Sequence, residues 1–179
     1  MKGVKPVVKK VTKINRDLLT LTYGAIVSQI VKDTDNIKEA NDQLEKLGFD
    51  IGSRLIDEFV AKSEGKLCQD YKEMANTIAK EGFEMFLGVK GELQELKADS
   101  HKDISFNIEL NENPLTDFVE IPEHLAGLSY NNIICGAIRG AINSLLLIGK
   151  VYMKQDQLLG DEKTIIRVEC KREKLKDED

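Results

Sequence analysis

The sequence predicts a mixed α/β domain of the α+β class, with a layer of four helices packed on a twisted antiparallel sheet of four strands. Two observations carry this prediction. Apolar residues recur at steps of three and four along the longer segments, which is typical of helices with one buried face. Apolar and polar residues then alternate strictly over residues 104–110, which is typical of a half-buried strand.

The composition suits one globular domain with a sizeable core, because 41% of the 179 residues are hydrophobic and 32% are charged. The net charge of −5 argues against nucleic acid as a partner. Cys68, Cys135 and Cys170 are far apart in sequence and fit reduced thiols in a cytosolic protein. Because His101 and His124 have no cysteine at ligand spacing, no metal site is expected.

The predicted domain spans residues 15–171, between a basic N-terminal arm, 1–14, and a charged C-terminal tail, 172–179. Six cations precede Asp17, the first acidic residue. Such an arm suits contact with an anionic membrane, and an ordinary solvated terminus is the alternative. The first residues, up to about position 15, lack the apolar core of a signal peptide.

Two helices are expected first. Asn15 can cap a helix that runs to about Asp33, and a second helix runs from about Ile37 to Lys62. Gly48 and Gly52 interrupt the second helix, where each glycine costs about 1 kcal/mol relative to alanine. Close packing against another helix ordinarily offsets this loss of stability, so the second helix is expected to cross another helix at Gly48 and Gly52.

A thiol stands at the start of the third predicted helix, which spans about Asp70–Leu87 and begins with the spacing of a capping box. Cys68 lies two residues before it, and one helix face carries Ala75, Ala79 and Gly82. This arrangement suits a long apolar ligand that is attached to the thiol and buried beside the helix. The alternatives are a small buried cysteine and a close-packed neighbouring helix.

The C-terminal half is expected to supply the sheet and the last helix. Residues 104–110 form the half-buried strand, and Asn113-Pro114 breaks the chain after it. The other expected elements are a partner strand at 91–97, a helix from Tyr130 to about Lys150 capped by Ser129, and strands at 152–158 and 163–171.

The stretch Ile133–Gly149 is mostly apolar, but it is too short for a membrane span and carries Arg139 and Asn143. It is therefore expected to be a buried helix. Arg139 in such a helix needs an anionic or carbonyl partner, for which Asp117 and Glu120 are the candidates.

No catalytic constellation is visible. The chain has no glycine-rich phosphate loop and no G-x-S-x-G elbow. Nothing in the sequence fixes a histidine near Cys68, as a cysteine nucleophile would need. No catalytic residue is therefore assigned, and a non-enzymatic protein is expected.

Four sequence runs resemble the small-subunit family of the transport protein particle, TRAPP, and within it the palmitoylated central subunit. They occur in the family's order and span most of the chain. The runs are Leu19–Ala25, Leu47–Ile56, Asn113–Pro122, and Cys135-Gly136 with Arg139-Gly140-Ala141.

This resemblance implies the same helix-on-sheet fold with a buried acyl tunnel. It places covalent palmitate on Cys68, with no other cofactor, and puts Gly82 beside the tunnel where the family keeps a small residue. Leu67 stands where relatives commonly carry a basic residue. The expected tunnel lining is Ala75, Ala79 and Gly82 on the third helix and Ile134, Ala137, Ile138 and Ala141 on the fourth, for which ordinary core packing is the alternative.

The resemblance also implies a core subunit of a complex that tethers vesicles in ER-to-Golgi transport. It would be cytoplasmic and peripheral at the cis-Golgi and endoplasmic reticulum, and would contact membranes through the assembly. The first two helices would pair with other TRAPP small subunits, or with a second copy when the chain is made alone. The expected interface residues are Tyr23, Ile26, Ile30, Leu44, Ile51 and Leu55.

Nucleotide exchange on a Rab-family GTPase would belong to the assembled complex. As the resemblance implies, the C-terminal segment would contact the GTPase through Lys171, Arg172, Asp177, Glu178 and Asp179. Two other functions remain open from the sequence. One is a sensor that binds a fatty acid or another apolar ligand reversibly, and the other is an acyl-transfer enzyme with Cys68 as nucleophile.

Overall fold

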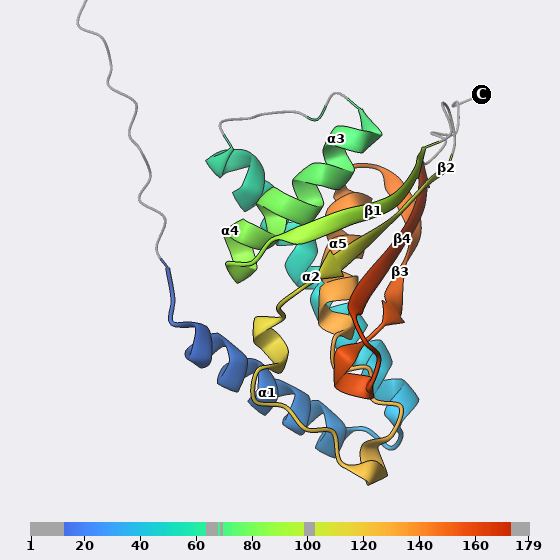
Figure 1. Cartoon of the computed structure of the whole chain (residues 1–179). Coiled ribbons are helices and arrows are strands. Elements are labelled where there is room, and N and C mark those ends of the chain that lie inside the picture. The colour runs from blue at the N-terminus through green and yellow to red at the C-terminus, as the bar shows by residue number, and fades with distance from the viewer. Residues whose placement is uncertain (1–12, 64–67, 69, 99–102, 173–179) are drawn as a thin grey trace, which may run out of the picture.

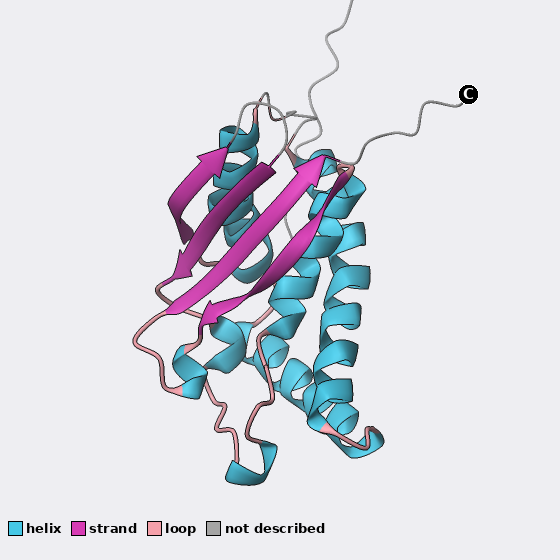
Figure 2. Cartoon of the chain, turned by 90° about the vertical axis from the view of Figure 1, so that its right-hand side faces the viewer, coloured by secondary structure: helices cyan, strands magenta, loops and turns pink. Residues whose placement is uncertain are grey.

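A computed structural model describes residues 13–63, 68, 70–98 and 103–172. Figure 1 shows the order of the elements, and Figure 2 shows the four-stranded antiparallel sheet in front with the helices behind it. The α+β class and the helix-on-sheet layering predicted from the sequence are confirmed.

The first two helices have the predicted bounds, because an asparagine caps each of them. Helix α1 spans Arg16–Asp33 and helix α2 spans Ile37–Lys62. The side-chain oxygen of Asn15 accepts a hydrogen bond from the N–H of Asp17 at 2.7 Å, and Asn36 caps α2 in the same way. Each cap satisfies a backbone donor that has no partner within the helix.

The third predicted helix is continuous, but its middle is wider than an α-helix. It consists of α3 (Tyr71–Asn76), a π-helical segment (Thr77–Gly82) and α4 (Phe83–Leu87). The predicted cap is confirmed, since Asp70 accepts a hydrogen bond from a first-turn N–H at 2.7 Å. The helix ends at Gly88, whose φ of 73° favours glycine.

The four strands form one sheet in the order β1-β2-β4-β3. Phe106 lies opposite Val168, and Ile108 lies opposite Ile166, so alternate residues of β2 and β4 face the helices together. The strands are β1 (Gly91–Ala98), β2 (Asp103–Leu110), β3 (Leu147–Gln155) and β4 (Thr164–Arg172).

The predicted bounds of the last helix are wrong at both ends. Helix α5 spans Asn132–Ser144 and stops short of Lys150, because the chain turns at Leu146, where φ is 59°. Strand β3 then begins at Leu147, earlier than the predicted start at Tyr152. The apolar run is therefore shared between a helix and a strand.

The predicted cap of this helix is also wrong. The hydroxyl of Ser129 donates to the side-chain oxygen of Asn132, and Asn131 occupies the cap position without a capping hydrogen bond. The amide of Asn131 instead donates to both carboxylate oxygens of buried Asp156, at 2.9 and 3.0 Å. A buried polar contact thus joins the start of α5 to the end of β3.

Helices α2 and α5 cross with their backbones in contact, as the two interrupting glycines predict. A Cβ atom at Gly48 would collide with the backbone of Ile133, and one at Gly52 would collide with the backbone of Ala137. Gly136 and Gly140 of α5 face the backbone of α2 in the same way. The close crossing therefore requires glycine on both helices.

Arg139 pairs with Glu45 of α2, so the predicted partners Asp117 and Glu120 are wrong. Its Nε atom lies 2.9 Å from a carboxylate oxygen of Glu45, and its guanidinium lies over the ring of Phe49, 4.9 Å from the centroid. Asp117 instead pairs with Arg16 at 2.8 Å. The helix crossing brings Glu45 and Arg139 together, although 94 positions separate them in the sequence.

The predicted domain bounds remain predictions. Strand β4 includes Arg172, the first residue of the predicted tail. Residues 1–12 of the basic arm and 173–179 of the tail lie outside the described residues. None of the described helices is both long enough and apolar enough to cross a membrane.

Candidate functional site

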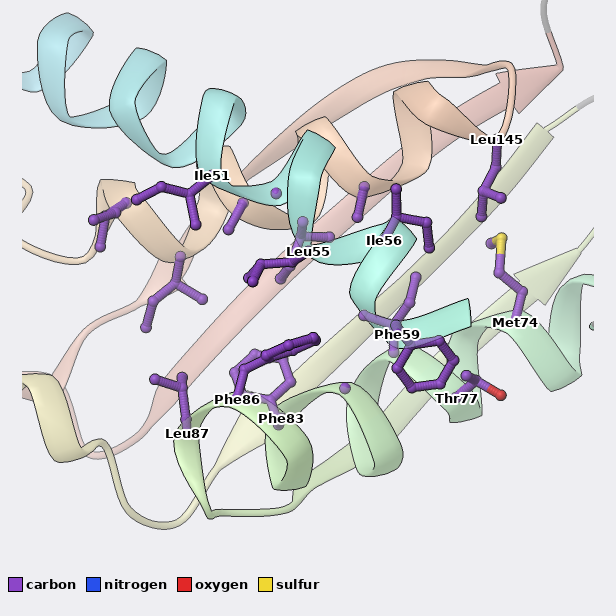
Figure 3. A pocket seen from close by; sticks show the side chains of 18 of the residues that line it. Ile51, Leu55, Ile56, Phe59, Met74, Thr77, Phe83, Phe86, Leu87 and Leu145 are labelled. Atoms are coloured by element: carbon purple, nitrogen blue, oxygen red, sulfur yellow. The ribbon is translucent and has the colours of Figure 1, made fainter. Parts of the chain in front are cut away.

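A large apolar cavity lies among the helices. It has a volume of about 920 Å³, which is at the upper end of the range of about 300–1,000 Å³ typical of small-molecule sites. Side chains from α1, α2, the α3–α4 helix and α5 line it. Figure 3 shows side chains of α2 and of the α3–α4 helix converging on the cavity. Its largest side chains include Phe59, Phe83 and Phe86. Such a cavity suits a ligand with a long hydrocarbon part.

Cys68 lies at the edge of this cavity. Its side chain is exposed, it belongs to the cavity lining, and its Sγ atom lies 3.7 Å from the hydroxyl oxygen of Thr77. The other two cysteines are buried away from the cavity lining. Burial raises the pKa of the Cys135 thiol to about 12 and that of Cys170 to about 11. Cys68 is therefore the accessible thiol among the three.

The side of the third helix that faces the cavity runs through α3, the π-helical segment and α4. A π-turn takes more residues than an α-turn, so positions four apart stay on one side of the helix. Met74, Ile78, Gly82 and Phe86 accordingly line the cavity. The predicted face of Ala75, Ala79 and Gly82 assumed the α-helical period.

Ala75 and Ala79 do not belong to the cavity lining, which corrects their predicted placement. Both are fully buried in the core. The carbonyl of Ala79 faces Gly91 of β1, where an added Cβ would approach it to 3.0 Å. The backbone at Ala79 therefore lies close to the sheet at Gly91.

Gly82 belongs to the cavity lining, and its predicted place beside an acyl chain stays a prediction. Among the described residues outside its own helical turn, a Cβ atom at this position would find one neighbour within 4 Å, the carbonyl oxygen of Thr77 at 3.6 Å. This is ordinary van der Waals contact. Gly82 therefore does not mark a tight helix crossing, in contrast to Gly48 and Gly52.

The predicted residues of the fourth helix lie on the opposite side of the cavity. Helix α5 presents Ile134, Ala137, Ile138 and Ala141 to it. The sequence reasoning missed the aromatic residues that line the cavity, Phe59 of α2 and the helically spaced pair Phe83 and Phe86 of α4. It also missed Arg172, whose place in the lining depends on the pairing of β3 with β4.

The predicted subunit interface divides into buried and exposed residues. Tyr23 and Leu44 are 3% and 0% exposed, so they belong to the core and offer no surface to a partner. Ile26 and Ile51 are 40% and 37% exposed, and Ile30 and Leu55 are partly buried. Ile26, Ile51 and Leu55 also line the cavity. The interface itself stays a prediction.

The predicted GTPase contacts are only partly described. Lys171 and Arg172 are exposed at the end of β4, and Asp177, Glu178 and Asp179 lie outside the described residues. Within the described ranges, no group of three or more His, Cys, Asp or Glu side chains is arranged to hold a metal ion.

The sequence matches the family model described as "Transport protein particle (TRAPP) component" over residues 19–169. It is 43% identical over 167 residues to transport protein particle subunit bet3 of Schizosaccharomyces pombe, covering 93% of this chain and 89% of that protein. It is also 43% identical over 163 residues to trafficking protein particle complex subunit 3 of Dictyostelium discoideum, covering 90% and 86%.

The fold is similar to a crystal structure of trafficking protein particle complex subunit 3 from Naegleria fowleri, which is covalently bound to palmitic acid. The TM-score is 0.81 and the sequence identity 42%, with 93% of this chain and all of that chain covered. The resemblance expected from the four sequence runs is thus confirmed over most of the chain. The chain belongs to the family of transport protein particle (TRAPP) components.

Proposed function

We propose that this chain is a non-enzymatic subunit of a TRAPP-like vesicle-tethering complex, acylated at Cys68 with the chain buried in the cavity. The observation that carries the proposal is the position of an accessible thiol at the edge of an apolar cavity of about 920 Å³. The palmitic acid bound covalently to the similar Naegleria fowleri protein supports the same ligand here.

A buried acyl chain would act as core filling rather than as a membrane anchor. Each buried methylene contributes about 0.8 kcal/mol, so a palmitoyl chain contributes roughly 10 kcal/mol at most. This is comparable to the net stability of a whole domain. Removal of the chain would cost the lining residues the contacts that they make with it. The acylated protein is therefore expected to be much more stable than the free thiol form.

Intact-mass spectrometry of the natively purified protein tests the acylation. The expected result is an adduct of one acyl chain that survives dialysis and is released by hydroxylamine, which cleaves thioesters. Cys68→Ser is expected to lack the adduct, and Cys170→Ala is expected to keep it. A lipid that dialyses away would favour the fatty-acid sensor, and transfer of the chain to a second acceptor would favour an enzyme.

The proposed partners are other TRAPP small subunits, which would bind through the exposed apolar residues of α1 and α2, such as Ile26 and Ile51. The assembled complex would act in ER-to-Golgi transport and promote nucleotide exchange on a Rab-family GTPase. The protein would be cytoplasmic and peripheral at the cis-Golgi and endoplasmic reticulum. Family membership and the relatives' names support this assignment.

A native pull-down followed by mass spectrometry tests the assembly. Related small subunits are expected to copurify in stoichiometric amounts, and the GTPase is expected to exchange nucleotide with the complex but not with this chain alone. Purification of the chain without any related subunit would contradict the proposal.

A further inference from the structure

We propose that Arg172 binds the anionic group of an incoming acyl ligand at the same end of the cavity as Cys68, an inference that rests on the acylation proposed above. The ligand class is a long-chain acyl compound with an anionic group beyond its hydrocarbon chain. Either the carboxylate of a free fatty acid or the phosphates of an acyl-coenzyme A could supply that group.

The sheet places Arg172 on the side that faces the helices. It is the last residue of β4 and pairs with Leu147, the first residue of β3. Val168 and Cys170 precede it at alternate positions and are buried against the helical layer. Arg172 and Leu147 both belong to the cavity lining.

The same geometry brings Arg172 toward the end of the cavity that holds the thiol. Figure 3 shows Leu145 toward the end with Met74 and Thr77, whereas Leu87 lies toward the other end. Thr77 is the residue that Cys68 approaches to 3.7 Å. Figure 1 also shows the start of α3 and the end of β4 at the same end of the molecule. Since Leu145 leads into β3 next to Arg172, the cation and the thiol share that end.

Charge is scarce around this cavity. Among the described lining residues, Asp70 and Arg172 are the two that carry a charge. The carboxylate of Asp70 accepts the N–H of Glu73 at 2.7 Å and caps the helix. Within the described part of the chain, Arg172 forms no ion pair. Its guanidinium donors are therefore available to a ligand.

An acyl ligand has the complementary shape and charge. The hydrocarbon chain would occupy the apolar cavity, and the anionic group would stay at its edge with Arg172. A guanidinium is planar and presents paired donors that match a carboxylate or a phosphate. With the coenzyme A ester, holding the ligand by both ends would orient its thioester carbonyl toward Cys68, which favours attachment through orientation. The Cys68 sulfur forms the new thioester bond, the bond from the acyl carbon to the coenzyme A sulfur breaks, and the thiol proton leaves with coenzyme A as its free thiol. A free fatty acid would bind through its carboxylate without becoming attached.

The test compares Arg172→Gln with Lys171→Gln, a matched control. Lys171 precedes Arg172 on the same strand, is exposed and carries the same charge, but it faces the other side of the sheet and does not line the cavity. Acylation of Cys68 is measured against the concentration of palmitoyl-coenzyme A and of palmitoyl-N-acetylcysteamine, an uncharged thioester. Binding of free palmitate is measured in a Cys68→Ser background.

Arg172→Gln is expected to raise the half-saturating concentration of palmitoyl-coenzyme A, or the Kd of free palmitate, about fivefold or more relative to Lys171→Gln. An effect on the coenzyme A ester assigns the phosphates as the ligand group, and an effect on palmitate assigns the carboxylate. Acylation by the uncharged thioester is expected to stay unchanged, with equal melting temperatures for both variants.

Two results would overturn the inference. In the first, Arg172→Gln has the same half-saturating concentration of palmitoyl-coenzyme A and the same Kd of free palmitate as Lys171→Gln. In the second, Arg172→Gln slows acylation by the uncharged thioester as much as acylation by palmitoyl-coenzyme A, which would indicate a structural role. If wild-type protein accepts no acyl chain and binds no palmitate, both the proposed acylation and this inference are contradicted. If wild type is acylated normally while the two variants agree, only the role of Arg172 is refuted.

Discussion

The Sγ atom of Cys68 lies 3.7 Å from the hydroxyl oxygen of Thr77, the first residue of the π-helical segment. The thiol therefore meets the third helix where its turns begin to widen. The same widening keeps Gly82 on the cavity side of the helix with Ile78. π-Helical turns are rare and occur frequently at functional sites. Here, the π-helical segment contains both Thr77, the neighbour of the Cys68 thiol, and Gly82, the small residue beside the cavity.

Selective alkylation is expected to separate Cys68 from the other two cysteines. Burial raises the pKa of Cys135 to about 12 and that of Cys170 to about 11, so the thiolate that reacts is scarce at both positions at pH 8. Cys68 is exposed. Iodoacetamide is expected to label one cysteine per native deacylated chain at pH 8, as counted by mass spectrometry.

Two states of the same protein serve as controls. Denatured protein is expected to take three labels, because unfolding exposes Cys135 and Cys170. Native acylated protein is expected to take none, because the thioester blocks Cys68. Labelling of Cys135 or Cys170 at the rate of Cys68 in native protein would contradict the burial of these thiols.

Cys68→Ser is expected to remove the acyl chain and lower the melting temperature. The loss comes from the apolar contacts of the buried chain, because the serine itself is exposed and makes little difference to packing. For a domain of this size, each kcal/mol of lost stability lowers the melting temperature by about 2–4 °C. Calorimetry of acylated wild type and of the variant measures the difference.

Wild type treated with hydroxylamine is the matched control, because it has the free thiol and an otherwise identical chain. It is expected to melt close to Cys68→Ser and well below acylated wild type. Equal melting temperatures for acylated wild type and Cys68→Ser would argue that the chain lies outside the core.

The sequence predicts those parts of the fold whose signals are local. Asn15 and Asp70 cap helices because their side chains accept backbone N–H groups two or three residues later. The glycines of α2 predict a close crossing because each lowers the stability of the helix relative to alanine, and close packing against another helix offsets this loss. The alternation at 104–110 predicts β2 because side chains on a strand point to opposite faces.

The errors occur where distant contacts decide the structure. The apolar run after Ser144 suits a helix and a strand equally well, and pairing with β4 makes it a strand from Leu147. The spacing of Ala75 and Ala79 does not indicate which side of their helix meets the cavity, and both residues are buried in the core instead. Arg139 pairs with Glu45 because of the helix crossing, and no local pattern indicates this partner.

Ile26→Glu is expected to weaken self-association and pairing with related subunits. Ile26 is a 40% exposed apolar residue on α1, and a buried unpaired carboxylate at an interface is costly. Sedimentation at micromolar concentration is expected to show a dimer for wild type and a shift toward monomer for the variant. Acyl occupancy is measured in parallel, because Ile26 also lines the cavity.

Leu159→Glu is the control for that substitution. Leu159 is 53% exposed in a short 3-10 turn after β3 and belongs to neither α1 nor α2, so the same change of side chain is expected to leave the dimer intact. Wild-type protein that is strictly monomeric at micromolar concentration would contradict the predicted interface of α1 and α2.

Gly82→Leu is expected to give a folded protein that accepts little or no palmitate at an intact Cys68. The leucine side chain has room to enter the cavity, because the neighbour that a Cβ at Gly82 would meet in the described part of the chain is the carbonyl oxygen of Thr77, at 3.6 Å. Once there, it would occupy the space of the acyl chain. Gly82→Ala is expected to be acylated normally and to gain up to about 1 kcal/mol in stability, since alanine favours helix over glycine. Mass spectrometry and thermal unfolding measure the two effects.

Gly52→Ala is the contrast that separates a cavity glycine from a crossing glycine. A single methyl group at Gly52 would collide with the backbone of Ala137, so even this small side chain is expected to cost about 1–3 kcal/mol or more. Gly82→Leu adds a larger side chain but is expected to lower the free energy of unfolding less than Gly52→Ala does, because the cavity can accept the leucine. If Gly82→Leu folds and is acylated as wild type, the acyl chain does not pass Gly82; if it is destabilised like Gly52→Ala, the space beside Gly82 is closed in solution.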